Sequence, residues 1–464
     1  MFRLLFQDRM FYRVLLRLAV PIILQNFITA AMNIIDVAMI GQLGETAVAA
    51  VGLSNQAFFV LTLLLFGISS GSAIFTAQFW GQRDVPNVRR VLGLCLLLGV
   101  SGGAVFTIIA VGFPDAFLGI YTRDLAVIEA GSPYLRISGL GYILTAITFS
   151  YASILRSTEE VRLPMLVSVI AILFKTVLSY LLIFGHLGFP QMGILGGAIG
   201  TVAARLLECV LLISLTYLRK TAAAASLREM NGFKGGYLRK YIKTAMPVVF
   251  NELAWSLGIT TYNMVYARIG TEAIAAMNIV FSIENLAFVA FIGISEATGI
   301  MIGNRIGAGE EGAAFQYARR SIILGVVGAL LIGGLILLSS GTILSIYNIS
   351  DTARDYSHKV LIISALSLWL RVTNLLIIVG VIRAGGDTRF GMLLDVSSIW
   401  LVGVPLALLG GFVFHLPVYH VYLLIMAEEA IKLAIGLYRF ASKRWINNLV
   451  RGIASPDGGL GNLP

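Results

Sequence analysis

Long apolar segments alternate with short polar ones along the whole chain. A helix needs about 20 mostly apolar residues to cross a hydrocarbon layer of about 30 Å. Segments of this kind occur twelve times, and each is predicted to form one membrane-spanning helix. They cover residues 14–40, 51–78, 90–113, 131–155, 164–185, 193–218, 242–266, 277–303, 319–346, 357–382, 390–412 and 419–441. The pattern therefore predicts an all-α integral membrane protein.

The second half of the chain repeats the first. A shift of 226 residues pairs Pro21 with Pro247 and Gly67 with Gly293. Matches at backbone-shaping Gly and Pro are more informative than matches among interchangeable apolar residues. Because each half contains an even number of helices, both halves begin on the same side of the membrane. We therefore predict twelve transmembrane helices in two pseudo-symmetric six-helix lobes, related by a parallel repeat.

The longest polar stretch lies between the sixth and seventh predicted helices and marks the boundary between the lobes. Its basic residues are compatible with two roles, contact with anionic lipid and simple solvation of a cytoplasmic connector. The predicted divisions are an N-lobe over 1–220, a cytoplasmic linker over 221–241, a C-lobe over 242–445 and a cytoplasmic tail over 446–464.

Composition excludes a water-soluble globular protein. Only 12% of the residues are charged, 58% are hydrophobic, and the mean hydropathy is +0.88. The two cysteines lie in apolar segments and the four histidines are dispersed, so we expect no disulfide framework, no metal site and no cofactor. The expected partners are small molecules and membrane lipids, and the chain is expected to be a monomer.

Basic residues are distributed very unevenly between the two sets of loops. Of the 34 Lys and Arg residues, 25 lie in the N-terminal segment, the C-terminal tail or loops after even-numbered helices, and four lie in the opposite loops. By the positive-inside rule, both termini are predicted to be cytoplasmic, in a multi-pass protein of the inner or plasma membrane. The same bias accounts for the net charge of +10, so no nucleic-acid partner is predicted.

Several short motifs occur in order along nearly the whole chain. They are Asp36-Val37-Ala38-Met39-Ile40-Gly41, Gly81-x-x-Asp84, Gly303-Asn304-x-x-Gly307, Arg383-Ala384-Gly385-Gly386-Asp387 and Arg439-Phe440-x-Ser442. With these motifs at this spacing, the chain resembles prokaryotic multidrug and toxic compound extrusion (MATE) transporters. The resemblance implies export of organic cations or other amphipathic compounds by alternating access, driven by inward flow of protons or sodium ions.

Charged residues within the predicted helices are candidates for function, because a charge at the membrane centre costs at least about 2.5 to 3.5 kcal/mol. Asp36 and Glu252 match the acids of the first and seventh helices in the family, so the resemblance implies roles in cation coupling. Asp36 lies fifteen residues beyond Pro21, about 22 Å along the helix, in the outer half of the membrane. Removal from water favours the protonated form of a carboxyl group, as a proton carrier requires.

Lys175 departs from the pattern of the family, whose members commonly have asparagine at this position. It lies about 16 Å into the fifth helix, near the membrane midplane. We predict that Lys175 and Asp36 form an ion pair that breaks when Asp36 is protonated. Ser179 and Val372 stand where some sodium-coupled members carry carboxylates, so proton coupling is favoured over sodium. The alternative for Lys175 is a structural role, with its ammonium reaching the interface or capping backbone carbonyls.

A polyspecific substrate cavity is expected to combine adaptable aromatic and methionine side chains with a few polar groups. Packing or lipid contact is the competing use of the apolar members of this set. The candidates for the cavity wall are Asn33, Tyr262, Met264, Trp255, Glu284, Arg371 and Asn374.

The remaining membrane charges are predicted to be structural. Glu428 lies one helical turn before Lys432, so these two are predicted to pair, near the cytoplasmic end of the helix. Asp395 lies six residues after Arg389 and is expected to be solvated at the membrane surface.

Two other function classes were weighed. A membrane-embedded enzyme is disfavoured, because the sequence contains no HExxH, GxSxG or phosphate-binding Gly-rich motif. A flippase or exporter of lipid-linked precursors or metabolites is the stronger alternative, since it shares the two-lobe architecture and would use basic groups such as Lys175 and Arg371 within a cavity.

Overall fold

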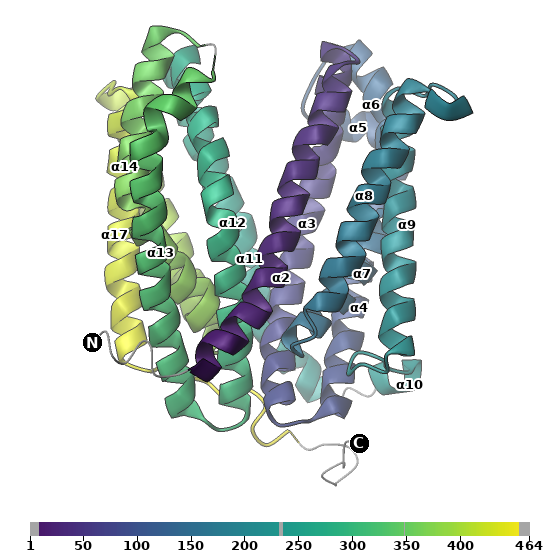
Figure 1. Ribbon diagram of the computed structural model, residues 1–464, viewed down its shortest axis with the longest axis vertical. Coiled ribbons are helices and arrows are strands. Elements are labelled where there is room, and N and C mark those ends of the chain that lie inside the picture. Colours follow the sequence, from purple (N-terminus) through teal and green to yellow (C-terminus); the bar gives the residue numbers. More distant parts are fainter. Residues whose placement is uncertain (1–8, 232–234, 348, 454–464) are drawn as a thin grey trace. The chain divides into compact units, whose positions relative to one another are not determined.

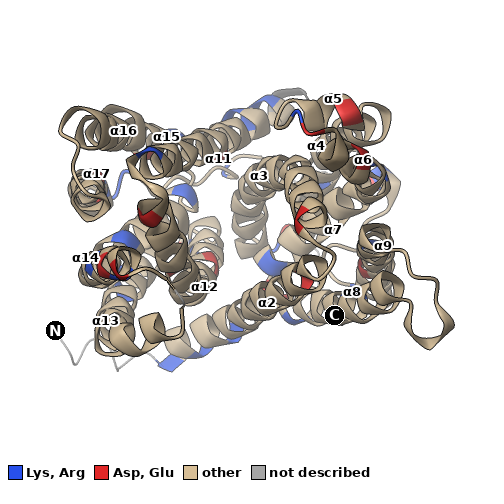
Figure 2. Ribbon diagram, turned by 90° about the horizontal axis from the view of Figure 1, so that it is seen from above, with Lys and Arg blue, Asp and Glu red and all other residues tan. Residues whose placement is uncertain are grey.

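The computed structural model describes residues 9–231, 235–347 and 349–453, and within these ranges the chain is helical with no strand (Figure 1). Parts of the predicted linker (232–234) and of the predicted tail (454–464) lie outside the described residues. Figure 2, which looks along the helices, shows acidic and basic residues among them.

The first half of the chain forms the predicted helices with short connections. They are α2 (Arg9–Gly41), α3 (Glu45–Gly81), α4 (Val85–Gly112), the pair α6 (Leu125–Gly139) and α7 (Tyr142–Ser157), α8 (Arg162–Phe184) and α9 (Ile194–Leu218). Helices α6 and α7 are bent by 45° at their junction and together correspond to the fourth predicted span. Two short elements, α5 (Pro114–Gly119) and η1 (His186–Gly188), lie in loops.

The second half begins with the short linker helix α10 (Leu227–Met230) and continues with long helices. These are α11 (Gly235–Ile269), α12 (Thr271–Gly307), α13 (Glu311–Ser345), α14 (Asp351–Leu375) with its π-helical extension η2 (Leu376–Arg383), the run α15 (Thr388–Ser398), η3 (Ile399–Gly403), α16 (Val404–Leu408) and η4 (Leu409–Val413), and α17 (Val418–Ala441). Wide π-helical turns are uncommon and occur often near functional groups.

The fold class predicted from the sequence is confirmed. Among the described residues, nine helices are long and apolar enough to cross a membrane, or ten when the bent pair counts as one span. Helices α11 and α17 fill the two remaining predicted spans. They fall outside that group because of their polar residues; α17 carries Glu428, Glu429 and Lys432 within one turn and a half.

The chain divides into two compact units. The described part of unit 1 comprises residues 9–23 and Phe250–Arg451, and unit 2 is formed chiefly by Leu24–Val249. The chain therefore leaves one unit for the other within α2 and within α11, two and three residues after Pro21 and Pro247. The predicted lobe limits, residues 220 and 242, stay a prediction.

The internal repeat is preserved in the packing of each unit. In unit 2, a Cβ atom on Gly67 of α3 would collide with Val249 of α11; in unit 1, a Cβ atom on Gly293 of α12 would collide with Ile23 of α2. Both members of these contacts are related by 226 residues. Glycine at the two positions lets the helix backbones approach closely, as is usual for helices packed in membranes.

The linker helix α10 is docked on unit 2. Ser226 caps it and forms a capping box with Glu229, whose carboxylate also binds Arg89 of α4. Burial alone would raise the pKa of Glu229, but the hydrogen bonds from Ser226 and Arg89 outweigh it and lower the pKa. The docked segment forms one wall of a cavity of about 480 Å³, lined otherwise by α4, α7 and α9.

Candidate ion-coupling sites

Asp36 and Lys175 meet in unit 2, where α2 packs on α8. Lys175 Nζ lies 2.5 Å from Asp36 Oδ2, and the exposed fractions of the two side chains are 27% and 16%. One residue further along α8, the Thr176 hydroxyl donates to the Met32 sulfur of α2. The predicted ion pair is therefore present, and Lys175 does not take the alternative role of capping backbone carbonyls.

The surroundings of this pair limit what else can bind there. Ser179, one turn beyond Lys175, is buried, and its hydroxyl has no hydrogen-bond partner among the described residues. A Cβ atom on Gly200 of α9 would collide with Ser179, so α9 packs tightly at this level. Chemically, the arrangement is a carboxylate with one ammonium partner, and a proton on Asp36 would remove the attraction between them.

A second basic side chain of unit 2 has no carboxylate contact comparable to that of Lys175. The guanidinium of Arg205 on α9 lies 4.0 Å from the ring centre of Phe58 and 5.8 Å from that of Tyr142. Its Nη1 atom has no hydrogen-bond partner within the described part of the chain. Aromatic faces thus supply part of the stabilisation that a carboxylate supplies elsewhere.

Glu252 of unit 1 lies against a cation rather than alone. Arg383 Nη1, at the end of η2, is 2.9 Å from Glu252 Oε1. This contact is an ion pair without hydrogen-bond geometry, because the same nitrogen has no hydrogen-bond acceptor in the described ranges. Both side chains are largely buried. The sequence placed Arg383 in a loop and gave no indication of this partner.

Glu284 and Arg371 form a second buried pair in unit 1. Arg371 Nη1 donates to Glu284 Oε1 at 2.5 Å, and the Tyr422 hydroxyl donates to the same oxygen at 2.6 Å. The Ser364 hydroxyl also donates to Glu284. The Glu284 carboxylate is thus neutralised and hydrogen-bonded.

The largest group of buried charges surrounds Lys432 of α17, whose side chain is 5% exposed. Lys432 Nζ lies 2.9 Å from Asp395, 2.8 Å from Glu428 and 3.7 Å from Glu429. Each acid also accepts a hydrogen bond from another helix: Asp395 from Asn251 at 3.1 Å, Glu428 from Tyr262 at 2.5 Å and Glu429 from Asn374 at 2.6 Å. We call Lys432 and these three acids the Lys432 cluster.

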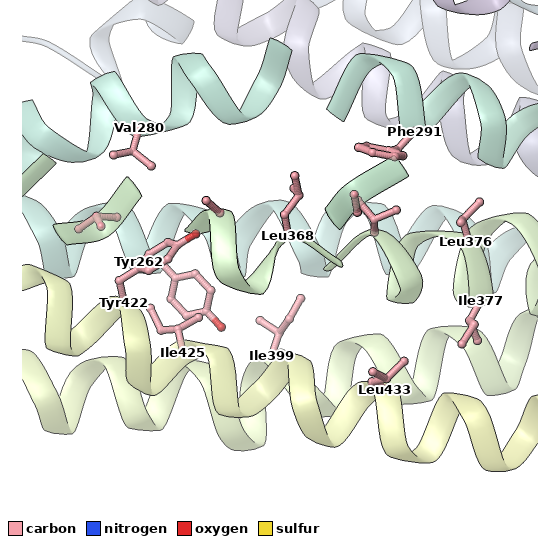
Figure 3. Packing of buried hydrophobic residues seen from close by; sticks show 14 of the residues in the cluster. Tyr262, Val280, Phe291, Leu368, Leu376, Ile377, Ile399, Tyr422, Ile425 and Leu433 are labelled. Atoms are coloured by element: carbon pink, nitrogen blue, oxygen red, sulfur yellow. The ribbon is translucent and has the colours of Figure 1, made fainter. Parts of the chain in front are cut away.

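Packing around the Lys432 cluster leaves room for these contacts. Figure 3 shows Tyr262 near Tyr422 and Ile425 in the buried core of unit 1, which also contains Ile399 and Leu433. A Cβ atom on Gly403, the last residue of η3, would collide with both the Tyr262 hydroxyl and the Glu428 carboxylate. Glycine at this position therefore permits the hydrogen bond between them.

Comparison with known proteins decides the family. The family model described as MatE matches residues 21–181 and 247–409, which is more than half of the chain. The chain belongs to the MatE family. The two matched segments correspond to the two halves of the internal repeat.

Curated relatives of this MatE protein cover nearly its whole length. The probable multidrug resistance protein NorM of Thermotoga maritima is 25% identical over 434 residues, which are 93% of this chain and 92% of the relative. The probable multidrug resistance protein YoeA of Bacillus subtilis is 27% identical over 441 residues, with 93% and 94% covered. The protein is thus a transporter of the multidrug efflux family and not an enzyme.

Solved structures show the same fold. A MATE protein in complex with MaL6 matches with a TM-score of 0.85 at 20% identity, over 95% of this chain and 98% of the other. A transporter of the MOP superfamily from Pyrococcus furiosus matches with a TM-score of 0.84 at 20% identity and the same coverage. Similarity at this identity supports the shared architecture of the MatE fold.

The structure corrects two expectations about this MatE chain. Asp395 is buried and paired with Lys432, so the expectation of a solvated residue at the membrane surface is wrong. Lys432 pairs with Glu428 as predicted, but it lies mid-helix and buried rather than near a helix end. The signal available in the sequence was the spacing Glu428-Glu429-x-x-Lys432 within an apolar helix.

The residues predicted for the cavity wall of the MatE protein fall into two groups. The side chains of Tyr262, Glu284 and Asn374 are buried and hydrogen-bonded within unit 1, and Arg371 is bound to Glu284. Three others are exposed on their helices, namely Asn33 on α2 and Trp255 and Met264 on α11.

Proposed function

We propose that the protein exports organic cations or other amphipathic compounds by alternating access, in exchange for protons. The observation that carries the proposal is the contact between Asp36 and Lys175, two oppositely charged side chains on separate membrane-spanning helices. Membership of the multidrug efflux family supports the substrate class.

A proton on Asp36 changes the energy of this contact strongly. Removing one charge of a partly buried ion pair leaves the other charge uncompensated, which costs several kcal/mol unless the structure rearranges. Protonation of Asp36 would therefore favour a conformation in which Lys175 reaches water or another partner. A ligand that binds one conformation better shifts the population of the two states, and here that ligand is the proton.

Sodium is a poorer coupling ion for this arrangement. Sodium ions bind several oxygen atoms at once, whereas the Lys175 ammonium already occupies a position 2.5 Å from the Asp36 carboxylate. A positive ion at Asp36 would be repelled by Lys175. Ser179 does not supply a second anionic ligand.

Export of an anionic lipid-linked precursor or metabolite is the second candidate function. It is supported by Arg205, whose Nη1 atom has no hydrogen-bond partner among the described residues. It is opposed by Lys175 and Arg371, because each of these cations is bound to a carboxylate and is not available to an anion. Competition for transport between a cationic dye and an anionic lipid analogue separates the two functions.

Purified protein in proteoliposomes tests the coupling ion. We expect an imposed pH gradient to drive uptake of a cationic dye, and a sodium gradient at equal pH on both sides to drive none. Dye movement driven by the sodium gradient alone would contradict the proposal. We further propose the orientation inferred from the basic loops, with both termini cytoplasmic in the inner or plasma membrane, and labelling of a cysteine introduced beside Arg451 from one side only would test it.

A further inference from the structure

Buried acids outnumber buried bases in unit 1. Arg371 and Arg383 each contact one carboxylate, whereas Lys432 contacts three. The carboxylates are those of Glu284, Glu252, Asp395, Glu428 and Glu429. Two of the five therefore lack a cation of their own. An uncompensated carboxylate out of water is strongly disfavoured, and such a group binds a proton instead.

The surplus belongs to Glu428 and Glu429. Asp395 is 2.9 Å from Lys432 and accepts a hydrogen bond from Asn251, both of which favour its ionised form. Arg383 interacts with Asp395 as well. The two glutamates are adjacent on α17 and share what remains of the positive charge of Lys432.

The charged and titratable groups around the two glutamates come from every helix packed against them. Helix α11 contributes Tyr262 and Tyr266, α14 contributes Arg371, and α15 contributes Asp395. The tyrosines are neutral donors, and Arg371 is already bound to Glu284. Lys432 is therefore the cation nearest to both glutamates among the described residues.

Unpartnered acceptors give independent support for a proton here. Asn374 is 4% exposed, and its Oδ1 atom has no hydrogen-bond donor among the described residues, although its amide nitrogen donates to Glu429. Glu428 Oε1 also has no hydrogen-bond partner in these ranges; its contact with Lys432 is an ion pair without hydrogen-bond geometry. Buried acceptors without a donor are rare in folded proteins. A protonated glutamate would supply the missing O–H donor.

We propose that Glu428 and Glu429 together bind one exchangeable proton, so that unit 1 contains a proton site separate from Asp36 in unit 2. Because the carboxyls are adjacent, the proton belongs to the pair rather than to either residue. A sodium ion is disfavoured, since the Lys432 ammonium lies within 3.7 Å of all three acids. The inference rests on the proposed proton exchange and adds a second proton to it.

Proton uptake by the purified full-length protein in detergent tests the second site without any transport assay. The protein is shifted from high to low pH in weak buffer with an indicator dye, and the carbonyl absorption of protonated carboxylic acids is followed in parallel by infrared spectroscopy. The variants are Glu428→Gln, Glu429→Gln and Asp36→Asn. Glutamine has the shape and neutrality of a protonated glutamate, so either single variant is expected to fold.

We expect the wild type to take up about two protons per molecule at these sites, and each single variant about one. Glu428→Gln combined with Asp36→Asn is expected to abolish both, with loss of the corresponding infrared bands. Unchanged uptake and an unchanged carbonyl band in both glutamine variants would overturn the second site. Displacement of the remaining proton of Asp36→Asn by sodium chloride, but not by choline chloride, would overturn it in favour of a sodium site.

The same measurement separates this inference from the proposed function. Unchanged uptake in Asp36→Asn would overturn the role of Asp36, whereas the two glutamine variants alone decide whether the pair on α17 binds a proton.

Discussion

Arg205 in unit 2 and Lys432 in unit 1 occupy corresponding positions of the internal repeat, 227 residues apart, but their surroundings differ. Arg205 lies on aromatic rings, and one of its nitrogens has no hydrogen-bond partner among the described residues. Lys432 lies among three carboxylates. The repeat has therefore kept the helix packing, including the contacts of Gly67 and Gly293, while the electrostatics of the two units have diverged.

The consequence is a division of charge between the units. Unit 2 has one prominent ion pair between membrane-spanning helices, Asp36 with Lys175. Unit 1 has several, linked through side chains of α11, α14, α15 and α17. A single pair responds to one proton in an all-or-none manner, whereas a network spreads the effect of losing any one member.

The largest expected effect is on transport through the single pair of unit 2. Asp36→Asn should reduce pH-driven export to the background of empty liposomes, because the substituted side chain binds no proton. Protein abundance in the membrane should be unchanged. Glu129→Gln, an exposed acid of α6, is the matched control and should export normally. Substantial export by Asp36→Asn would remove Asp36 from the mechanism and with it the contrast between the units.

The next effect is on stability and tests Arg205 against Lys432 directly. Lys432→Met leaves three buried acids without their common cation and should destabilise the protein by about 3 to 5 kcal/mol. Arg205→Met removes contacts with aromatic rings and should cost about 1 to 2 kcal/mol. Thermal unfolding of both variants in the same detergent measures the difference. Equal losses would show that the two environments stabilise their cations equally.

A smaller effect is expected from the coupling between Asp36 and Lys175. Asp36→Asn and Lys175→Ala should together destabilise the protein less than the sum of the single changes, because a lone buried charge costs more than none. The coupling energy in a double-mutant cycle of thermal stability should exceed about 0.5 kcal/mol. Additivity within about 0.3 to 0.5 kcal/mol would mean that the side chains do not interact in the membrane-bound protein.

The smallest expected effect is at the docked linker of unit 2. Because the pKa of Glu229 is lowered in the folded protein, its stabilising contribution is complete above the unfolded carboxyl pKa of about 4.3 and is lost as the pH falls through the folded value. Glu229→Gln should loosen α10 by at most about 1 kcal/mol at neutral pH.

Hydrogen exchange of the α10 amides, corrected for intrinsic rates, measures this loosening. The difference between wild type and Glu229→Gln should disappear as the pH is lowered. Arg228→Gln, at the exposed neighbouring position, is the control and should exchange as the wild type does. A difference that persisted in acid would contradict the role of the Arg89 contact.

The sequence predicted the fold and one of the ion pairs for a clear physical reason. Span length and the repeat depend on hydrophobicity along the chain, which a sequence displays directly. The depths of Asp36 and Lys175 follow from the helical rise per residue, so that two charges at similar levels in neighbouring helices were expected to meet. Their contact at 2.5 Å confirms that expectation.

The cluster around Lys432 was not predicted, because it depends on the direction in which side chains leave their helices. Helices that are apolar on all sides have no polar face that reveals this direction. The wide turns of η2 and η3 also change the angular spacing of the residues that follow. Asp395 follows η2, and Arg383 ends it, so the positions of both were misjudged from the sequence.

The transfer of the chain between units at residues 23 and 249 has a consequence for biosynthesis. Residues 24–249, which form unit 2, are contiguous, so the ribosome completes them as one block. Residues 9–23 are made before that block, yet they pack with partners that begin at Phe250. Because domains generally fold as units during synthesis, this first segment has to remain unpaired in the membrane until more than two hundred further residues have been added. The last helices to be inserted therefore complete the packing of the first.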